Sequence, residues 1–250
     1  MRKRFISERI AKKLSRAGVC SRRLAEKMIL DRRICVDGVV IDTPATLVNE
    51  KSIIAVDGRE IAEPERERLW RHHKARGILS TNSDPKGRPT IFEKLPEELP
   101  RVMLVGRLDF NSEGLILLTN NGELARKLEL PETGWTRRYR VRVHGEIVMS
   151  KLEGLEEGIT ISGVHYGPMS VKLEKKQNSN SWLLVTLREG KNREVRRVLK
   201  YLGLQVNRLI RVSFGPFHLG KMQSGEVREI SAKVIAEQIN FDKRSSDRRR

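Results

Sequence analysis

Two short apolar runs in the middle of the chain flank a polar loop. Residues 102–105 read Val-Met-Leu-Val and residues 114–119 read Gly-Leu-Ile-Leu-Leu-Thr, with Gly, Asn and Asp between them. Runs of this length and composition predict buried strands. The loop carries Asp109, which the strands would anchor on both sides. A carboxylate held in this way suits catalysis, although an Asp between strands more often stabilises a turn through its own backbone.

The first 61 residues have the pattern of a small α/β unit. Ser7 is expected to cap a helix that reaches Leu14, and Ser21 to cap a second helix over residues 22–30. The inward positions of the second helix are Leu24, Ala25 and Met28. A strand over residues 33–36 then meets Asp37-Gly38, a hairpin signal that recurs at Asp57-Gly58.

The rest of the chain alternates strands and helices without a βαβ rhythm. Residues 62–68 are charged and contain proline, which is typical of a linker. Strands are expected over residues 182–187 and 205–214, and a helix over residues 194–202. The fold class expected is α+β, a small N-terminal α/β domain followed by a mixed, mostly antiparallel sheet with flanking helices. The expected boundaries are 1–61 for the first domain, 62–68 for the linker, 69–240 for the second domain and 241–250 for a basic disordered tail.

Composition adds a strong positive charge to this picture. The 250 residues hold 50 Lys and Arg against 32 Asp and Glu, a formal net charge of +18. Such an excess favours a polyanionic partner, and nucleic acid is the first candidate. No secretory signal, lipidation motif or membrane-spanning run is present, and two cysteines suit a reducing compartment. We therefore expect a cytoplasmic protein that does not bind membranes.

Three segments concentrate the cations. Ser21-Arg22-Arg23 opens a predicted helix, where a phosphate would meet free backbone N–H groups, although a capped helix with solvated arginines explains it equally well. Residues 137–143 alternate, with Tyr139 on an apolar face and Arg138 and Arg140 on the other. A solvated sheet face would produce the same alternation.

The predicted helix over residues 194–202 separates its charges in a similar way. Its polar side carries Arg193, Arg196, Arg197 and Lys200, and the loop before it adds Lys191. An arginine at a helix start opposes the helix dipole, so it calls for a bound anion or a paired carboxylate. We expect Asp109 to be the carboxylate that pairs with Arg196.

The segments that come near to a cofactor or metal motif each lack a residue that the motif requires. Residues 215–222 nearly spell a phosphate-binding loop, but Met222 stands where Ser or Thr would reach magnesium and Pro216 interrupts the loop. The adjacent His72 and His73 lack a third metal ligand nearby, and no GxGxxG is present. We therefore expect neither a metal nor a small-molecule cofactor.

Several longer motifs, taken together, resemble a known family. Gly106-Arg107-Leu108-Asp109 followed by Ser112-x-Gly114-Leu115-x-Leu117-Leu118-Thr119-Asn120-x-Gly122 is similar to the signature of RNA pseudouridine synthases of the RsuA/RluB group. The stretches 73–77, 84–90 and 189–197 follow in the family's order. The N-terminal unit resembles the alpha-L RNA-binding domain of ribosomal protein S-four. The likeness is strongest to the branch that acts on large-subunit ribosomal RNA.

This resemblance implies roles for individual residues. Asp109 matches the essential carboxylate, Tyr139 the aromatic that stacks on the target base, and Arg196 the arginine that pairs with the acid. Arg107 matches the motif arginine beside it. Residues expected to contact RNA are Ser21, Arg22, Arg23, Lys74, Arg138, Arg140, Lys191, Arg193 and Arg197. The chain departs from the family with Lys74-Ala75 in place of Lys-Pro and with Ser112 where Thr is common.

The resemblance also implies the reaction. Uracil would leave ribose at nitrogen-1, rotate, and rejoin through carbon-5, after a specific uridine of ribosomal RNA has been flipped out of its helix. Asp109 would act when ionised, a form that a neighbouring guanidinium favours, and either as nucleophile or as base. A non-catalytic RNA-binding or ribosome-assembly factor is the alternative, and a monomer is the simplest oligomeric state.

Overall fold

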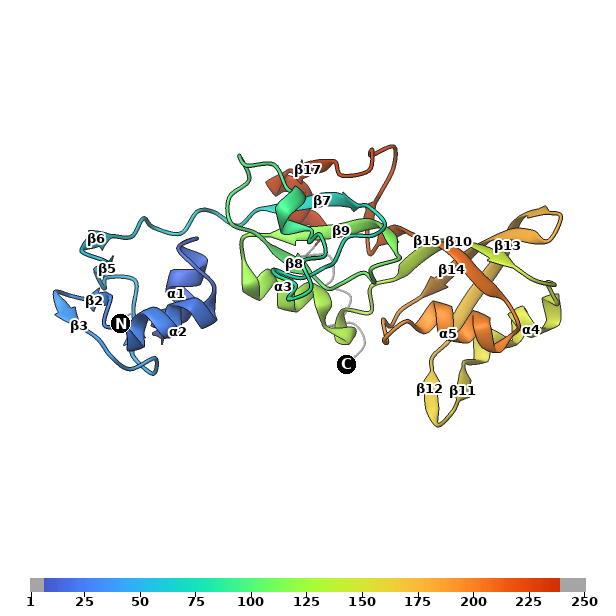
Figure 1. The fold of residues 1–250 in the computed structure, drawn as a ribbon, viewed down its shortest axis with the longest axis horizontal. Helices are drawn as coiled ribbons and strands as arrows, with labels where there is room; N and C mark the ends of the chain where they lie inside the picture. The colour runs from blue at the N-terminus through green and yellow to red at the C-terminus, as the bar shows by residue number, and fades with distance from the viewer. Residues whose placement is uncertain (1–6, 239–250) are drawn as a thin grey trace. The chain divides into compact units, whose positions relative to one another are not determined.

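A computed structural model of the chain describes residues 7–238, which divide into two compact units (Figure 1). The first unit holds the described residues up to Glu67 together with 98–103 and 120–122, and the second holds the others. The basic tail expected over residues 241–250 lies outside the described part. Among the residues that are described, no helix is long and apolar enough to cross a membrane.

The first unit begins with two helices, α1 (Ile10–Arg16) and α2 (Arg22–Leu30). The hydroxyl of Ser21 accepts a hydrogen bond from the backbone N–H of Leu24 at 3.1 Å, which confirms the predicted cap of α2. Apolar side chains of both helices meet β-strand residues in one core, which includes Ile10, Leu14, Ala25, Ile29 and Ile34.

Both predicted hairpins of this unit are confirmed. β2 (Ile34–Val36) pairs with β3 (Val39–Val40), and β5 (Ile54–Val56) pairs with β6 (Arg59–Glu60). Asp37 and Asp57 each have φ 51°, and the glycines that follow them also have positive φ. Two consecutive residues with positive φ are what the tightest hairpin turns require.

Two details of the predicted helices are wrong. Ser7 does not cap α1, because residues 8–9 form a short strand, β1 (Glu8–Arg9), that pairs with β4 (Leu47–Val48), and Arg9 takes the cap position. Leu24 is 48% exposed, while Ala25, Met28 and Ile29 are buried. The buried stripe of α2 therefore lies about one residue further round the helix than the pattern suggested.

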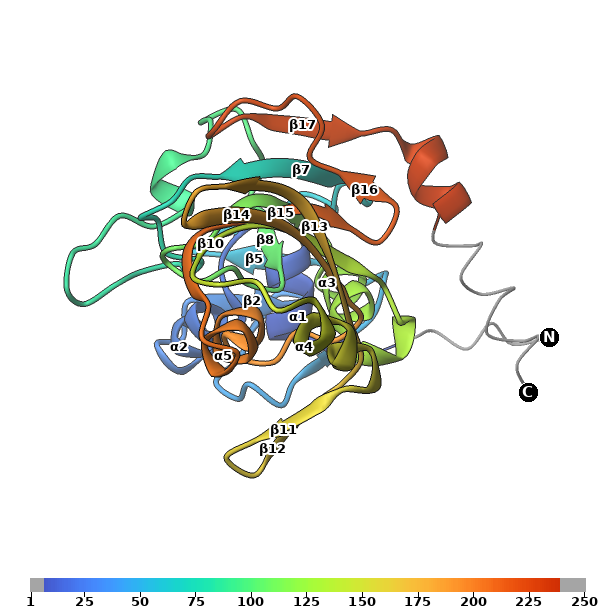
Figure 2. The same cartoon turned by 90° about the vertical axis from the view of Figure 1, so that its right-hand side faces the viewer.

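A sheet of nine strands dominates the described part of the second unit (Figures 1 and 2). Its path runs β13-β14-β10-β15-β9-β7-β17, with β8 paired to β9 and β16 to β15. The bounds of its strands are β7 (Leu69–Lys74), β8 (Met103–Val105), β9 (Glu113–Thr119), β10 (Arg137–His144), β13 (Met169–Gln177), β14 (Asn180–Leu187), β15 (Gln205–Phe214), β16 (Phe217–His218) and β17 (Val227–Ile230). The described part also contains α3 (Gly122–Glu129), α4 (Met149–Glu153), α5 (Glu194–Tyr201), the hairpin β11 (Ile159–Ile161) with β12 (Val164–Tyr166), and short 3₁₀ turns at Phe92–Lys94, Pro131–Thr133 and Gly154–Glu157. Residues 232–238 are helical as well.

The sheet confirms the α+β expectation and its mostly antiparallel character. Strand pairs β13–β14, β14–β10, β10–β15, β9–β7 and β7–β17 are antiparallel. The pair β9–β15 is parallel, with Ile210 opposite Glu113 and Arg211 opposite Gly114. Parallel neighbours start at the same end of a sheet, so the segments that precede β9 and β15 are brought to one side of the molecule.

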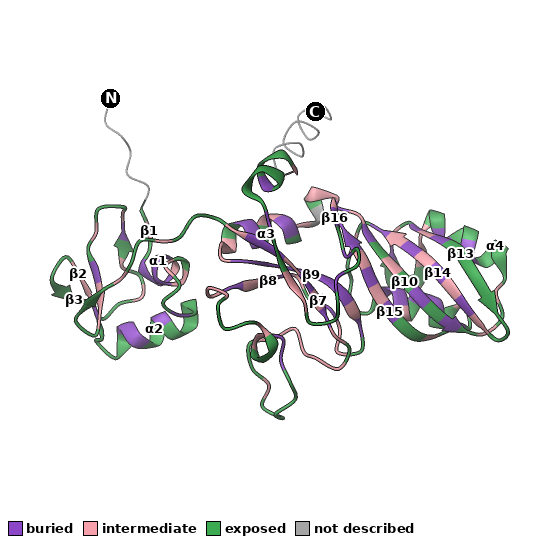
Figure 3. Ribbon diagram, turned by 90° about the horizontal axis from the view of Figure 1, so that it is seen from above, coloured by how far each residue is buried: buried purple, intermediate pink, exposed green. Residues whose placement is uncertain are grey.

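At β10 and β14 one face of the sheet is covered and the other is open, whereas β9 is buried at every position from 114 to 119. Val195, Val198 and Leu199 of α5 pack with Leu152 of α4 against the inward side chains of β10 and β14, and Figure 2 shows both helices on the same side of these strands. The predicted alternation of β10 is confirmed, since Val141 and Val143 are buried while the arginines between them are exposed. In Figure 3 buried bands alternate with exposed or half-buried bands along β10 and β14.

Candidate active site

A polar cavity of about 230 Å³ opens in the second unit. Its walls come from the loop before β9, the inward face of β10, the segment before α5, and β15. Four of its lining residues matter most for chemistry, and they are Asp109, Tyr139, Arg193 and Glu194.

The loop that carries Asp109 is fixed by hydrogen bonds at both ends. The N–H of Gly106, at φ 71°, donates to a carboxylate oxygen of Glu129 at 2.7 Å. Ser80 binds Leu108 twice, because its hydroxyl donates to the carbonyl and accepts from the N–H. The N–H of Ser112 donates to the carbonyl of Asp109 at 2.9 Å and closes a turn. Asp109 therefore combines the turn-forming role with a side chain directed at the cavity.

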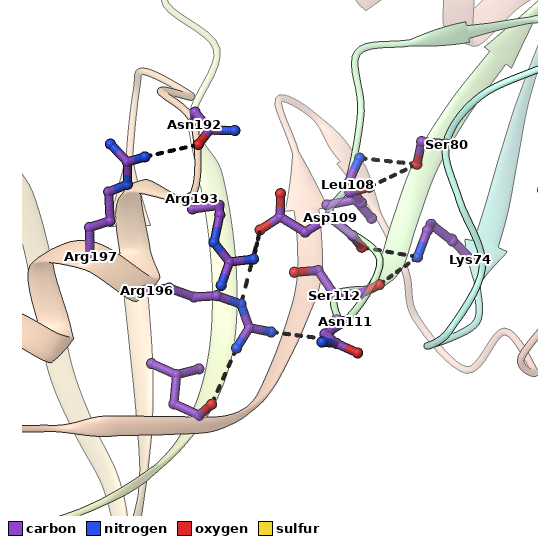
Figure 4. Close-up of polar contacts among 11 residues, drawn as sticks. Lys74, Ser80, Leu108, Asp109, Asn111, Ser112, Asn192, Arg193, Arg196 and Arg197 are labelled. Atoms are coloured by element: carbon purple, nitrogen blue, oxygen red, sulfur yellow. Dashed lines mark hydrogen bonds and ion pairs between the residues drawn. The ribbon is translucent and has the colours of Figure 1, made fainter. Parts of the chain in front are cut away.

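Lys74 holds the same loop from below. Its ammonium donates to the carbonyls of Ala75, Asp109 and Ser112 at 3.0, 3.2 and 2.7 Å (Figure 4). The side chain is fully buried, and burial lowers the pKa of Lys74 to about 8. We expected Lys74 to contact RNA, and the structure corrects this, because an ammonium without exposed surface cannot reach a phosphate.

Two arginines converge on the carboxylate of Asp109, which is 27% exposed (Figure 4). Nη1 of Arg193 lies 3.5 Å from its Oδ2, and Nε of Arg196 lies 4.0 Å from the same oxygen. Arg196 is itself held by the carbonyls of Asn111 and Val206, at 2.9 and 3.2 Å. The structure thus brings Arg196 to Asp109 but gives the shorter ion pair to Arg193, which the sequence placed only among the RNA contacts.

Tyr139 and Arg107 lie at the cavity as well. Tyr139 is half-buried on the inward face of β10 and packs against Leu108 and its apolar neighbours. Arg107 is exposed at the cavity wall. An aromatic ring, a carboxylate and several guanidinium groups can together hold a flat, uncharged ring whose substituents carry negative charge.

A carboxyl pair supports the segment before α5. Glu194 is only 3% exposed, and one of its oxygens accepts from the N–H of Lys191 at 2.9 Å. Its other carboxyl oxygen is buried without a hydrogen-bond partner among the described residues, and burial together with the neighbouring Glu189 raises the pKa of Glu194 to about 8. Glu189 accepts from the N–H of Gly167 at 2.6 Å, and its other oxygen lies 2.6 Å from Nζ of Lys191. The pair therefore holds one proton at neutral pH.

The expected RNA contacts fall into three places. Lys191 and Arg193 line the cavity, and Arg197 follows one turn along α5, where it donates to Asn192 at 3.2 Å. Arg138 and Arg140 are exposed on the opposite, open face of the sheet, where Arg140 pairs with Glu174 and lies over the ring of Trp182. The group Ser21, Arg22 and Arg23 is exposed at the start of α2 in the first unit.

Sequence reasoning missed the residues that position the carboxylate. Ser80 and Glu129 lie in segments without a motif, and no local pattern connects them to the loop. For Glu194 the sequence held one signal, which is its place at the first position of a predicted helix, where the helix dipole favours Glu. Among residues 7–238, no group of three or more His, Cys, Asp or Glu side chains is arranged to hold a metal.

Comparisons with known proteins identify the family of the chain. The model of a family described as RNA pseudouridylate synthase matches residues 68–201, and that of the S4 domain matches residues 8–54. A solved structure titled as that of a pseudouridylate synthase has the same fold, with a TM-score of 0.64 and 23% identity over 92% of this chain and 99% of its own.

Curated relatives are more similar in sequence. An uncharacterised RNA pseudouridine synthase of Rickettsia prowazekii is 46% identical over 92% of this chain and 97% of its own length. The ribosomal large subunit pseudouridine synthase B of Salmonella typhimurium is 40% identical over 86% of this chain and 76% of its own length. The chain therefore belongs to the RNA pseudouridylate synthases of the RsuA/RluB group, and carries an S4 domain in its N-terminal part.

Proposed function

We propose that the chain converts a specific uridine of ribosomal RNA, in the large subunit, into pseudouridine, with Asp109 as the catalytic residue. The observation that carries this proposal is the carboxylate of Asp109 at the wall of a 230 Å³ cavity, paired with Arg193 and Arg196. The name of the Salmonella relative and the S4 domain support ribosomal RNA as the substrate.

The reaction requires that the uracil ring leave its stack. The bond between nitrogen-1 and the ribose breaks, the ring rotates, and carbon-5 bonds to the same sugar carbon. The proton of carbon-5 is released and nitrogen-1 gains one, so the product is an isomer. Extruding a base costs a few kcal/mol, and stacking on Tyr139 would return about 1–3 kcal/mol. The cations near the cavity supply further binding energy through the phosphates.

Asp109 serves this reaction in its ionised form. Two roles suit a carboxylate here, attack on the sugar carbon or removal of a sugar proton. Arg193 and Arg196 balance its negative charge and hold its orientation, while Lys74 and Ser80 fix the backbone beneath it. Arg107, exposed beside the cavity, is placed to fill the gap that the extruded nucleotide leaves in the RNA.

A tritium-release assay tests the proposal directly. Unmodified large-subunit ribosomal RNA labelled at carbon-5 of uridine should lose tritium to water with the wild-type chain. Asp109→Asn should abolish the release and leave RNA affinity within a few fold, because one carboxylate performs the chemistry and many cations perform the binding. Glu153→Gln, the same kind of change at an exposed position of α4, is the matched control and should stay active.

The alternative, a non-catalytic RNA-binding or ribosome-assembly factor, is supported by the charge of +18. The same assay separates the two functions, since such a factor would bind the labelled RNA without releasing tritium. Turnover of Asp109→Asn near the wild-type rate would refute the assignment of the catalytic residue. Mapping pseudouridines in ribosomal RNA from cells with and without the protein would identify the target uridine.

A further inference from the structure

A second hollow of the described second unit runs along α5 beside the cavity. This groove has a volume of about 590 Å³ and is formed by one side of α5 and the turn that leads into β15. Its walls are Arg193, Arg196, Arg197, Lys200 and residues 203–206. Four of these residues are cationic and none carries a carboxylate, so the groove concentrates positive charge.

Arg193 and Arg196 face the carboxylate of Asp109, whereas Arg197 and Lys200, further along α5, have no carboxylate partner among residues 7–238. The side chain of Lys200 has no hydrogen bond or ion pair with any residue between 7 and 238, and that of Arg197 donates only to the uncharged Asn192. Arg196 donates to two backbone carbonyls. Burial, and after it the neighbouring Arg193, lower the pKa of Arg196, and the nearby Asp109 acts in the opposite direction. Charges gathered in this way are stabilised when an anion binds.

The groove and the cavity share one wall. Arg193 lines both, and its guanidinium lies 3.5 Å from Asp109. Figure 4 shows Arg193 and Arg196 directed at Asp109, while Arg197 turns away from it towards Asn192. A polymer with one monomer bound in the cavity would therefore have its neighbouring monomers at the groove.

We propose that this groove binds the phosphodiester backbone of the nucleotides next to the uridine in the cavity. The proposal rests on the function proposed above and adds a direction in which the RNA strand leaves the site. Arg193 and Lys200 are seven residues apart, about 10 Å along the helix axis. A single phosphate ion cannot span that distance, whereas successive phosphates of one strand can. RNA thus fits the groove better than a free anion.

The open face of the sheet provides the matched control. Arg142 of β10 is exposed there, and no ion pair or hydrogen bond of its side chain is seen within residues 7–238. Its replacement removes the same charge as a groove variant does, but on the face opposite α5. Unlike Arg138 and Arg140 on the same face, Arg142 is not among the residues expected to contact RNA, and it lines neither the cavity nor the groove.

The test compares Arg197→Gln with Lys200→Gln, alone and combined, against Arg142→Gln. Tritium release from unmodified large-subunit ribosomal RNA gives KM and kcat, and filter binding over a range of salt gives the salt slope. The double variant should raise KM about tenfold or more with kcat unchanged. Its salt slope should fall by about 1–2, as expected for one or two lost phosphate contacts. Arg142→Gln should change neither quantity.

Two results would overturn the proposal. Equal changes of KM and salt slope in the double variant and in Arg142→Gln would indicate diffuse electrostatic attraction and no specific binding of RNA in the groove. An unchanged KM and salt slope in the double variant would show that RNA does not bind in the groove. In that case, if inorganic phosphate inhibits the wild type but not the double variant, the groove is a site for a free anion. If the wild-type chain releases no tritium, the proposed function fails, and the salt slopes alone still decide whether RNA occupies the groove.

Discussion

Asp109 depends on residues that are far from it in the chain. Lys74 and Ser80 hold its backbone, and Arg193 and Arg196 face its carboxylate. The hydrogen bond from the N–H of Lys191 to the carboxyl group of Glu194 holds the segment from which Arg193 extends. Arg193 has φ 53°, an unfavourable conformation for a residue other than glycine, and surrounding contacts must maintain it.

The carboxyl pair predicts a dependence of stability on pH. The pKa of Glu194 rises from 4.5 to about 8, so the folded chain binds more protons than the unfolded chain between these values. The stabilisation is complete below pH 4.5 and is lost as the pH rises through about 8. Glu194→Gln keeps the shape and an N–H donor but does not titrate. The Tm of Glu194→Gln relative to that of the wild type should therefore increase as the pH rises from about 5 to about 9.

Thermal unfolding in matched buffers measures this difference, with the exposed Glu153→Gln as the control that should follow the wild type. If the difference in Tm between wild type and Glu194→Gln is the same at every pH, the pKa of Glu194 is not raised in the folded chain.

At the scale of elements, the parallel pair β9–β15 builds the site. Asp109 precedes β9, and α5 with its arginines precedes β15. Because these strands start at the same end of the sheet, the acid and the guanidinium groups meet despite their separation in sequence. The alternation of β10 then directs Tyr139 to the cavity and its exposed arginines to the open face.

This strand pair requires a glycine at position 114. Gly114 has φ 106°, and an added Cβ would lie 2.4 Å from the carbonyl oxygen of Arg211 in the neighbouring strand. Gly114→Ala should lower the free energy of unfolding by about 3 kcal/mol or more, as steric overlap in a packed sheet does. Gly154→Ala is the control, because a Cβ there meets nothing within 4 Å. Denaturant unfolding compares the two, and equal stabilities would show that the strands can separate without cost.

At the scale of the whole molecule, charge determines how the chain meets RNA. The net charge of +18 is spread over both units and over exposed arginines of several elements. Neutralising phosphates releases counterions, so affinity should fall steeply with salt. The expected monomer stays a prediction, which light scattering of the purified chain would check.

The salt dependence is a quantitative test of this charge. Between about 50 and 200 mM salt, RNA affinity should fall by about a thousandfold or more if six or more phosphates are contacted. Filter binding at several salt concentrations gives the slope. An RNA affinity that does not change with salt would contradict electrostatic binding and would also contradict the proposal that RNA binds in the groove.

Local patterns determined much of this protein in advance. Period-two alternation predicted β10 and its faces, Asp-Gly pairs predicted two hairpins, and short apolar runs predicted β8 and β9 around Asp109. These features depend on residues within a few positions of one another, which is why a single sequence reveals them. The family motifs belong to the same class, since each is a continuous run.

Only the tertiary structure decided the partners across the sheet. It buried Lys74 under the loop, exposed Leu24, and gave Arg193 the shorter contact with Asp109. Which side chains meet depends on strand order and on the parallel pairing of β9 with β15, and neither leaves a local pattern. The residues proposed for the chemistry could thus be named from continuous motifs, whereas the groups that hold them in place became visible only when distant segments were packed together.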